Sequence, residues 1–379
     1  TRRRLIMGAI SLTNSSIYAQ NINNFTGELF KVGGQRTPFL SAVGGLNGGT
    51  AIQSTFFQIQ AADNAVVSSE PTKGQEGAAP TEYLGRDRVA YTFATQVFHK
   101  GVQMTYTALA SYQNQNPFDL SANIANSSDG DGTVTAGDKL GLFGGNPVTD
   151  EFANQLELAM EKVAREVEWF AFNGTFADGA NTTPGSGTRE MRGLKQWVGL
   201  NGNANNTVAP TGVGGNIHYC DADGDATSAA RDLTWDAIAE GMKRLYDAHA
   251  PMKNPVLVVT PKQLLALNKE LAKGTIGLAA AIIPRDRNVA GIDIDTVVTP
   301  FGSIGMMVLD PNIMPAGTAY ILDLAFIKPV FTNIPGYGTV FVRDIDQDAN
   351  ARVGKAIYME MGFDFGPPSY HLLFEQTNS

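Results

Sequence analysis

Residues 36–45 read RTPFLSAVGG and follow an N-terminal segment that has no sustained core pattern. Pro38 disfavours a helical backbone at Thr37 and so favours an extended approach to the apolar residues. Phe39 and Leu40 open a small apolar plug, which two glycines soon end. Because so short a plug has no core of its own, we expect it to anchor an N-terminal arm on another surface.

The next segment, residues 46–92, has apolar side chains only near its two ends. Residues 63–88 between them are rich in Gly, Pro, Thr and charge, and so long a connection without a core is unusual inside a compact domain. If the flanks pair as strands, the segment is a long two-stranded tongue. Such a ribbon is marginal in water, so it should rest on a neighbouring chain. The apolar flanks are Phe56, Phe57 and Ile59 on one side and Val89, Tyr91 and Phe93 on the other.

The longest helical pattern covers residues 149–173, which would span about 37 Å. Thr149 is a suitable N-cap, and Asp150 and Glu151 follow in the first turn, where the helix dipole favours negative charge. The apolar stripe comprises Phe152, Leu156, Met160, Val163, Val167 and Phe170. The opposite, polar side is predicted to carry Glu157, Glu161, Arg165 and Glu168. Glu161 and Arg165 are spaced for a helical ion pair.

A compact α/β region follows. Thr234 is the N-cap of a predicted helix that runs to about His249. Residues 255–259 predict a fully buried strand, after which Pro261 opens another helix. We expect that helix to bury Leu264, Leu265 and Leu267. Further strands are predicted at residues 295–298, 304–309 and 319–322, and a long hairpin at residues 339–345 and 352–361.

This order of parts resembles the major capsid protein of tailed bacteriophages, whose Hong Kong 97-type fold is shared with encapsulin shells. That family has an N-terminal arm, a Thr-Pro-Phe-like anchor, an extended loop, a long spine helix that ends near Asn-Gly-Thr, and an axial domain. Here Thr37-Pro38-Phe39 stands at the anchor, and Asn173-Gly174-Thr175 ends the longest helical pattern. Arg192-Gly193-Leu194 follows as the small residue-Gly-Leu start of the axial domain. The match lies in the order of these motifs over nearly all of the chain.

The resemblance implies an α+β fold of the Hong Kong 97 type. Its expected parts are an N-terminal arm and anchor (1–45), an extended loop (46–92), a peripheral domain (93–190 and 339–365) and an axial domain (191–338 and 366–379). The peripheral domain would contain the spine helix (149–173) and an insertion (114–147).

The function implied by the resemblance is structural and not enzymatic. The chain would be a major capsid protein that self-assembles into hexamers and pentamers of an icosahedral phage head. That head would enclose double-stranded DNA without sequence-specific binding. The expected location is the virion, assembled in the host cytoplasm, with scaffolding, portal and cement proteins as further partners.

The resemblance also implies interface residues. Thr37, Pro38 and Phe39 would grip a neighbouring subunit. Some members of the family join subunits by a Lys–Asn isopeptide bond that a Glu assists. The candidate donor is Lys73 at the loop tip, flanked by Glu70 and Glu76.

Composition restricts the function further. The 28 basic and 37 acidic residues leave a net charge of −9, so affinity for a phosphate backbone is not the main property of the chain. The single Cys220 excludes an internal disulfide framework and a Cys-based zinc finger. No apolar run approaches the roughly 18 residues that a membrane span needs, so no membrane partner is expected.

Motifs of catalysis are missing from the sequence: it has no phosphate-binding glycine loop, dinucleotide fingerprint, nucleophile elbow or His-Glu-x-x-His zinc motif. Asp344 and Asp346 could serve as an acid–base pair, which keeps a hydrolase as an alternative. Their place in a charged hairpin turn favours solvated surface. His99 is interpreted as a structural side chain.

Two acidic segments have the spacing of calcium loops. Residues 127–138 resemble an EF-hand or dockerin-type loop, although position one is Ser and position twelve is the short Asp138. The candidate ligands are Asp129, Asp131, Thr133 and Asp138, and in a second, weaker cluster Asp221, Asp223 and Asp225. No cofactor is required, and calcium is the one candidate. The alternative for both segments is an acidic surface turn.

Two other functions stay open at this point. An encapsulin-type protein compartment would have the same fold, with a groove for cargo peptides in place of DNA contents. A secreted calcium-dependent binding module would account for the acidic loops, and it should be monomeric.

Overall fold

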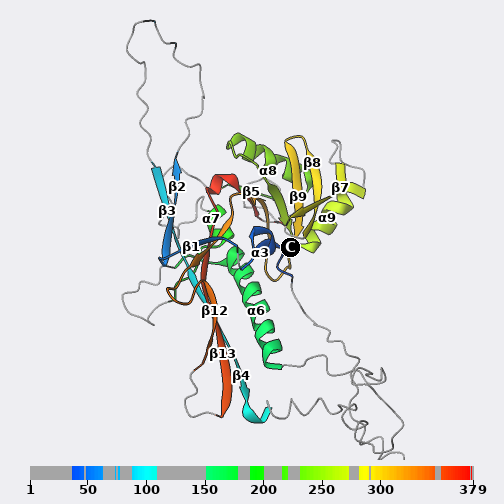
Figure 1. The fold of residues 1–379 in the computed structure, drawn as a ribbon. Helices are drawn as coiled ribbons and strands as arrows, with labels where there is room; N and C mark the ends of the chain where they lie inside the picture. The colour runs from blue at the N-terminus through cyan, green and yellow to red at the C-terminus, as the bar shows by residue number, and fades with distance from the viewer. Residues whose placement is uncertain are drawn as a thin grey trace, which may run out of the picture. The chain divides into compact units, whose positions relative to one another are not determined.

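The computed structural model describes residues 36–46, 48–62, 73, 76, 88–108, 151–177, 188–199, 216–220, 231–272, 281–289, 292–345, 351–375 and 377. In this part of the chain the strands form three sheets (Figure 1). The chain divides into two compact units, of which the first comprises residues 1–34, 102–158 and 345–354 and the second the remainder. The sites discussed below lie in the second unit.

The largest sheet has seven strands in the order β5-β14-β10-β6-β9-β8-β7. Figure 1 labels β5 and, near the opposite end of this order, β9, β8 and β7. β6 is parallel to β9 and antiparallel to β10, so the sheet is mixed. Every residue of β6 and of β10 is buried, which requires cover on both faces of the sheet. The strands are β5 (Ile217–Tyr219), β6 (Pro255–Val259), β7 (Ala281–Val289), β8 (Ile292–Thr299), β9 (Gly302–Val308), β10 (Thr318–Asp323) and β14 (Leu372–Glu375).

Two helices accompany this sheet, α8 (Trp235–Asp247) and α9 (Pro261–Ala272). The backbone N–H of Ala237 donates to the Thr234 hydroxyl over 3.2 Å, which confirms the predicted N-cap. The two helices are joined where the Trp235 indole N–H donates to the carbonyl of Leu267 over 3.2 Å. The prediction for the second helix is wrong at Leu265, which is 54% exposed, because that side chain points away from the helix face that buries Leu267.

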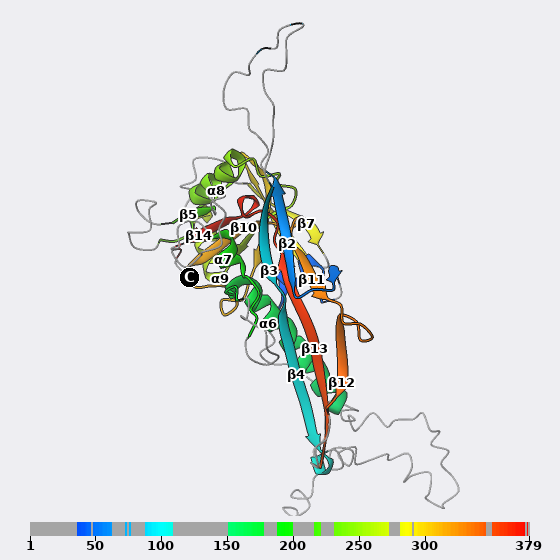
Figure 2. The same cartoon turned by 90° about the vertical axis from the view of Figure 1, so that its left-hand side faces the viewer.

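The second sheet has five strands, with β11 and β12 pairing with successive parts of β13 and β4 also pairing with β13 (Figure 2). The β12–β13 pair confirms the predicted hairpin. β1 and β11 join this same sheet, although their residues fall in the predicted extended loop and axial domain. Its strands are β1 (Thr50–Ile52), β4 (Gln96–Thr105), β11 (Lys328–Thr332), β12 (Val340–Asp344) and β13 (Arg352–Asp364).

The third sheet is the predicted tongue, in which β2 (Phe56–Ala62) pairs with β3 (Arg88–Ala94). The strands are antiparallel, and their register runs from Phe56 opposite Ala94 to Ala62 opposite Arg88. Residues 63–87 connect them, of which the structure describes residues 73 and 76.

The spine helix is α6 (Glu151–Asn173), and the predicted cap residues 149 and 150 lie outside the described residues. Arg165 and Glu161 form the predicted ion pair, with 3.1 Å between their charged atoms. α6 lies beside β4, where Phe98 packs edge-on against Phe170 at 5.9 Å between ring centroids. The prediction is wrong for Glu168, which is fully buried. Near its C-terminal end, the helix therefore has buried residues on more than one side, and its burial extends beyond a single apolar stripe.

Three short helical segments complete the described elements: α3 (Pro38–Val43), α7 (Leu194–Val198) and the 3₁₀ turn η1 (Pro368–Tyr370). α3 is the predicted plug, and Pro38 begins it after a non-helical Thr37. The arm before residue 36 and the predicted insertion at residues 114–147 lie outside the described residues.

Candidate functional site

The plug is buried in its own chain. Phe39 is 0% and Leu40 3% exposed. The Phe39 ring lies edge-on against Phe172 of α6, with centroids 4.9 Å apart, and is tilted against Phe363 of β13 at 6.0 Å. The plug therefore anchors the start of the described chain on its own core. Phe39 is not available to a neighbouring subunit in this conformation, in contrast to the expectation from sequence.

Glu168 holds the plug from the spine helix. One of its carboxyl oxygens accepts a hydrogen bond from the backbone N–H of Leu40 over 3.3 Å, and the other is enclosed without a partner. Burial raises the pKa of Glu168 to about 8, and the backbone hydrogen bonds from Leu40 and Phe39 offset only part of that effect. The neutral carboxyl is therefore favoured near pH 7.

The root of the tongue rests on an aromatic cluster. Phe57 of β2 stacks on Phe93 of β3 at 5.4 Å, and Phe93 packs on Trp197 of α7 at 4.8 Å. Tyr91 meets the same indole edge-on at 4.9 Å. The Trp197 N–H donates to the carbonyl of Gly366 over 3.0 Å, which fixes the indole itself. One face of the tongue is thereby attached to the body of its own chain.

The other face of the tongue is open in the single chain. Phe56 is 38% exposed, and Gln58 and Gln60 on the same side of β2 are exposed as well. Alternation of buried and exposed residues is the pattern of a strand with one covered face. The outward face carries one large aromatic ring among amides, a composition suited to a protein contact.

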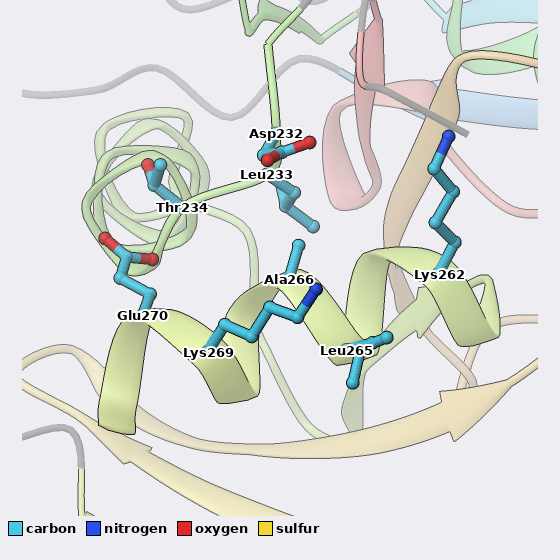
Figure 3. Close-up of a pocket in the computed structure, with 8 residues that line it drawn as sticks. All are labelled: Asp232, Leu233, Thr234, Lys262, Leu265, Ala266, Lys269 and Glu270. Atoms are coloured by element: carbon cyan, nitrogen blue, oxygen red, sulfur yellow. The ribbon is translucent and has the colours of Figure 1, made fainter. Parts of the chain in front are cut away.

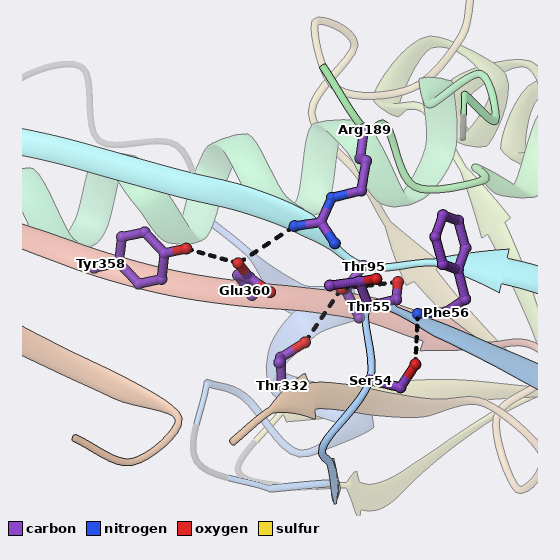
Figure 4. Close-up of polar contacts among 8 residues, drawn as sticks. All are labelled: Ser54, Thr55, Phe56, Thr95, Arg189, Thr332, Tyr358 and Glu360. Carbon is purple, nitrogen blue, oxygen red and sulfur yellow. Dashed lines mark hydrogen bonds and ion pairs between the residues drawn. The ribbon is translucent and has the colours of Figure 1, made fainter. Parts of the chain in front are cut away.

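Hydrogen bonds hold the two ends of the tongue at its base (Figure 4). The Ser54 hydroxyl accepts from the backbone N–H of Phe56 over 3.2 Å. Thr95 donates to the carbonyl of Thr55 through its backbone N–H at 2.9 Å and its hydroxyl at 3.2 Å. The Thr332 hydroxyl of β11 bonds to the Thr95 hydroxyl over 3.1 Å. The tongue root is thus tied to the five-stranded sheet.

A second polar group lies beside this base (Figure 4). Glu360 on β13 accepts from Arg189 over 3.3 Å and from the Tyr358 hydroxyl over 2.6 Å. Burial, together with the hydrogen bond to Glu360, raises the pKa of Tyr358 to about 12. Glu360 is buried and paired, so the cluster fixes β13 against the segment that follows α6.

A cavity of about 340 Å³ lies between α9 and the segment before α8 (Figure 3). Lys262, Leu265 and Lys269 line it from α9, opposite Asp232 and Leu233. Glu270 lies at one end, but its carboxylate accepts the backbone N–H of Trp235 over 3.0 Å and is engaged in holding the two helices together. Charged side chains of both signs therefore surround the exposed Leu265 in this cavity.

The predicted metal and cross-link residues are only partly described. Asp129, Asp131, Thr133, Asp138, Asp221, Asp223, Asp225 and Glu70 lie outside the described residues. Lys73 and Glu76 are described and exposed. Within the described ranges no cluster of His, Cys, Asp and Glu is arranged to hold a metal ion. The same ranges contain no helix long and apolar enough to cross a membrane.

Sequence reasoning missed the roles of Glu168, which holds the plug, and of Trp197, which supports the tongue root. Periodicity placed Glu168 on the polar side of its helix. Trp197 gave one usable signal, since it is one of only 3 tryptophans in the chain and follows the Arg192-Gly193-Leu194 motif.

Comparisons with known proteins agree on the fold. The capsid asymmetric unit of cyanophage A-1(L) superposes with a TM-score of 0.59 at 12% identity, covering 97% of this chain and 100% of that chain. The capsid of the native GTA particle gives 0.53 at 16% identity, covering 97% and 99%. The holo-SrpI encapsulin of Synechococcus elongatus PCC 7942 gives 0.54 at 12% identity, covering 96% and 95%. These likenesses establish the Hong Kong 97-type fold.

Sequence comparison is more specific. No match was found among curated proteins. The family model described as SU10 major capsid protein matches residues 11–378, nearly the whole chain. The chain therefore belongs to the SU10 major capsid protein family and is a structural subunit of the viral capsid.

Proposed function

We propose that this chain assembles into hexamers and pentamers that close an icosahedral phage head around double-stranded DNA. The tongue carries the proposal: β2 and β3 form a two-stranded sheet of their own, attached to the body on one face and open on the other. A ribbon of two strands is marginal alone, so its open face is suited to a neighbouring copy. Repetition of one such contact around an axis builds a closed ring.

The first experiment is sedimentation and negative-stain microscopy of the purified chain. Rings or shells are the expected result. A chain that stays monomeric at every concentration and ionic strength contradicts the proposal and favours the binding-module alternative. The nucleic-acid content of the particles is measured in the same preparation, because the phage role predicts particles that can enclose double-stranded DNA.

The other partners follow from the same role. We expect a scaffolding protein during assembly, a portal at one vertex, cement proteins on the outside, and assembly in the host cytoplasm. A net charge of −9 supports packing of DNA without tight adhesion to the shell. Co-expression with candidate scaffolding proteins tests this: an unchanged yield and size of particles with every candidate argues against the requirement.

An encapsulin-type compartment is the second candidate, favoured by the likeness to the SrpI encapsulin. The two functions differ in contents. Particles purified from the native source contain long double-stranded DNA in the phage case and a specific protein cargo in the compartment case. Absorbance spectra and mass spectrometry of nuclease-treated particles separate them.

Calcium binding is proposed from the sequence pattern alone, at Asp129, Asp131, Thr133 and Asp138 and, more weakly, at Asp221, Asp223 and Asp225. Bound calcium would order these loops at the contacts between subunits. Chelator should then lower the thermal stability of particles, and added calcium should restore it. Magnesium serves as the control. Unchanged stability and assembly in chelator reject the idea.

The Lys73 cross-link is a separate proposal. Its amine would condense with an Asn side chain of a neighbour and release ammonia, with Glu70 or Glu76 as the base. The exposed position of Lys73 and Glu76 supports it. A ladder of covalent multimers on a denaturing gel, absent from Lys73→Arg, is the expected sign, and a single monomer band from mature particles excludes it.

A further inference from the structure

Arg192 is an unusual residue in the second unit. Its side chain is 2% exposed, and its Nε is enclosed without a hydrogen-bond partner. No ion pair to Arg192 occurs among the residues that the structure describes. Burial is the cause that lowers its pKa to about 10, with no carboxylate acting in the opposite direction. The guanidinium nevertheless stays charged at neutral pH.

Three aromatic rings surround this cation. The guanidinium carbon lies 4.7 Å from the ring centre of Phe176 and 5.5 Å from those of Phe93 and Trp197. Aromatic faces attract a cation, but they offer no strong hydrogen-bond acceptor. A buried charge without a counter-charge is unfavourable, because its lost hydration is not replaced. Arg192 is therefore expected to destabilise the subunit in this state.

A second buried donor, on a side chain that also contacts Trp197, lacks an acceptor as well. The Tyr91 hydroxyl is enclosed without a hydrogen-bond partner, and the Tyr91 ring packs on the same Trp197 indole as Arg192. Buried polar atoms are almost always paired, so two unpaired donors on one indole need a common explanation. An anionic group is the acceptor that each of these donors would bind most strongly.

The rings of Phe93, Phe176 and Trp197, here called the cage, are not equally buried. Phe93 and Trp197 are 1% and 0% exposed and belong to the core. Phe176 is only partly buried, and its position depends on the hydrogen bond from its backbone N–H to the Gln196 side chain at 2.7 Å. Phe176 is thus the least buried of the three rings, and an acceptor would reach Arg192 from its side.

We propose that Arg192 and Tyr91 form a receptor for a carboxylate that a second copy of this chain inserts at the tongue root on assembly. The inference rests on the proposed assembly. A second copy is favoured because the capsid role brings copies together and because the chain has a surplus of carboxylates, 37 acidic against 28 basic residues.

The test compares Arg192→Met with the parent chain. Methionine keeps an unbranched side chain of related length without charge. Unassembled Arg192→Met subunits should melt at the same temperature as the parent or higher, because a buried unpaired charge has been removed. The fraction of protein in particles, measured by sedimentation, should fall at least tenfold. Tyr91→Phe should act in the same direction, more weakly.

Lys195→Met is the matched control, since it removes an exposed cation from α7 close to the cage and should leave assembly unchanged. Normal particle formation by Arg192→Met overturns the proposal, and so does a lower melting temperature of its subunits, which assigns Arg192 a structural role. Normal particles that fail to retain DNA identify a phosphate ligand instead and also overturn it. If the parent chain forms no particles, the failure belongs to the proposed function.

Discussion

Two buried titratable side chains make the stability of this subunit depend on pH in opposite directions. Glu168 has its pKa raised to about 8 by burial. His371 is fully buried, and burial lowers its pKa to about 4. The neutral His371 ring accepts from the backbone N–H of Asp323 over 3.2 Å and donates to the carbonyl of Phe365 over 2.5 Å. Both groups are built into the fold in their neutral forms.

The direction of each effect follows from linkage. Glu168 has a higher pKa folded than unfolded, so its stabilisation is complete below the ordinary glutamate pKa of 4.5 and is lost as pH rises through about 8. His371 has a lower pKa folded, so its stabilisation is complete above the ordinary histidine pKa of 6.5 and is lost as pH falls through about 4. Their sum gives a broad maximum of stability between pH 4.5 and 6.5.

Glu168→Gln tests the alkaline side of this maximum. Glutamine keeps the acceptor for Leu40 and cannot ionise. The melting temperature of the parent subunit should fall between pH 6.5 and 8.5, and that of Glu168→Gln should fall less. Glu166→Gln is the control on the same helix, because Glu166 forms a partly exposed ion pair with Lys100 at 2.8 Å. Parallel curves for the parent and Glu168→Gln would show that Glu168 does not titrate in this range.

At the scale of elements, the tongue has a root that is fixed to its own chain and an outer face that is exposed in the single chain. The root is tied down by the aromatic cluster on Trp197 and by the hydrogen bonds of Thr95. β2 and β3 pair without a shift in register up to Ala62, which lies opposite Arg88. These contacts all lie outside residues 63–87, so we expect the root to fold without that segment.

Replacement of residues 63–87 by Asn-Gly, the preferred sequence of a two-residue hairpin turn, tests this expectation. We expect subunits that melt within a few degrees of the parent, because the contacts of the root are kept. We expect no particles, because the reach toward a neighbour is lost. A flexible Gly-Ser connection of the parent length is the matched control for loop length. Normal particles from this short-turn variant would show that residues 63–87 of the tongue are not needed for assembly.

Packing between α8 and β14 supplies another test at this scale. A Cβ at Gly241 would lie 2.5 Å from Leu372 Cδ2 and 2.6 Å from Phe374 Cζ, and both side chains are fully buried. Gly241→Ala should therefore destabilise the subunit by about 1–3 kcal/mol through overpacking, which outweighs the gain in helix propensity of up to about 1 kcal/mol. Chemical denaturation measures the difference.

Lys243→Ala, at an exposed position of the same helix, controls for general effects on α8. It should change the free energy of unfolding by less than about 0.5 kcal/mol. A Gly241→Ala subunit as stable as the parent would mean that α8 and β14 can move apart without loss.

At the scale of the whole molecule, the capsid role links stability to assembly. A partner that binds only the folded state raises the apparent melting temperature by mass action. Particles should therefore melt above free subunits, and the difference should grow with protein concentration. The short-turn variant should show neither effect. Calorimetry at several concentrations checks this, and equal melting temperatures for particles and subunits would contradict a stabilising interface.

Much of the architecture could be predicted from the sequence because it is encoded locally. The spine helix, the cap at Thr234, the buried strand at residues 255–259 and the strands of the tongue were predicted at or near their observed bounds. Periodicity, caps and turn residues act within a few positions of each other, so a linear pattern contains them. The order of these parts was also enough to indicate the capsid family.

Tertiary structure alone decided which side chains are buried and which sheet each strand joins. It placed Glu168 inside and Leu265 outside, put β11 beside β13, seated Phe39 in its own core and enclosed Arg192 between three rings. The contact between Leu40 and Glu168 spans 128 positions of sequence. Burial depends on neighbours at such separations, and no periodicity in one segment specifies them. The sequence by itself thus determined the elements, their order and the family, whereas the groups that fix the plug and the tongue root were set by long-range packing.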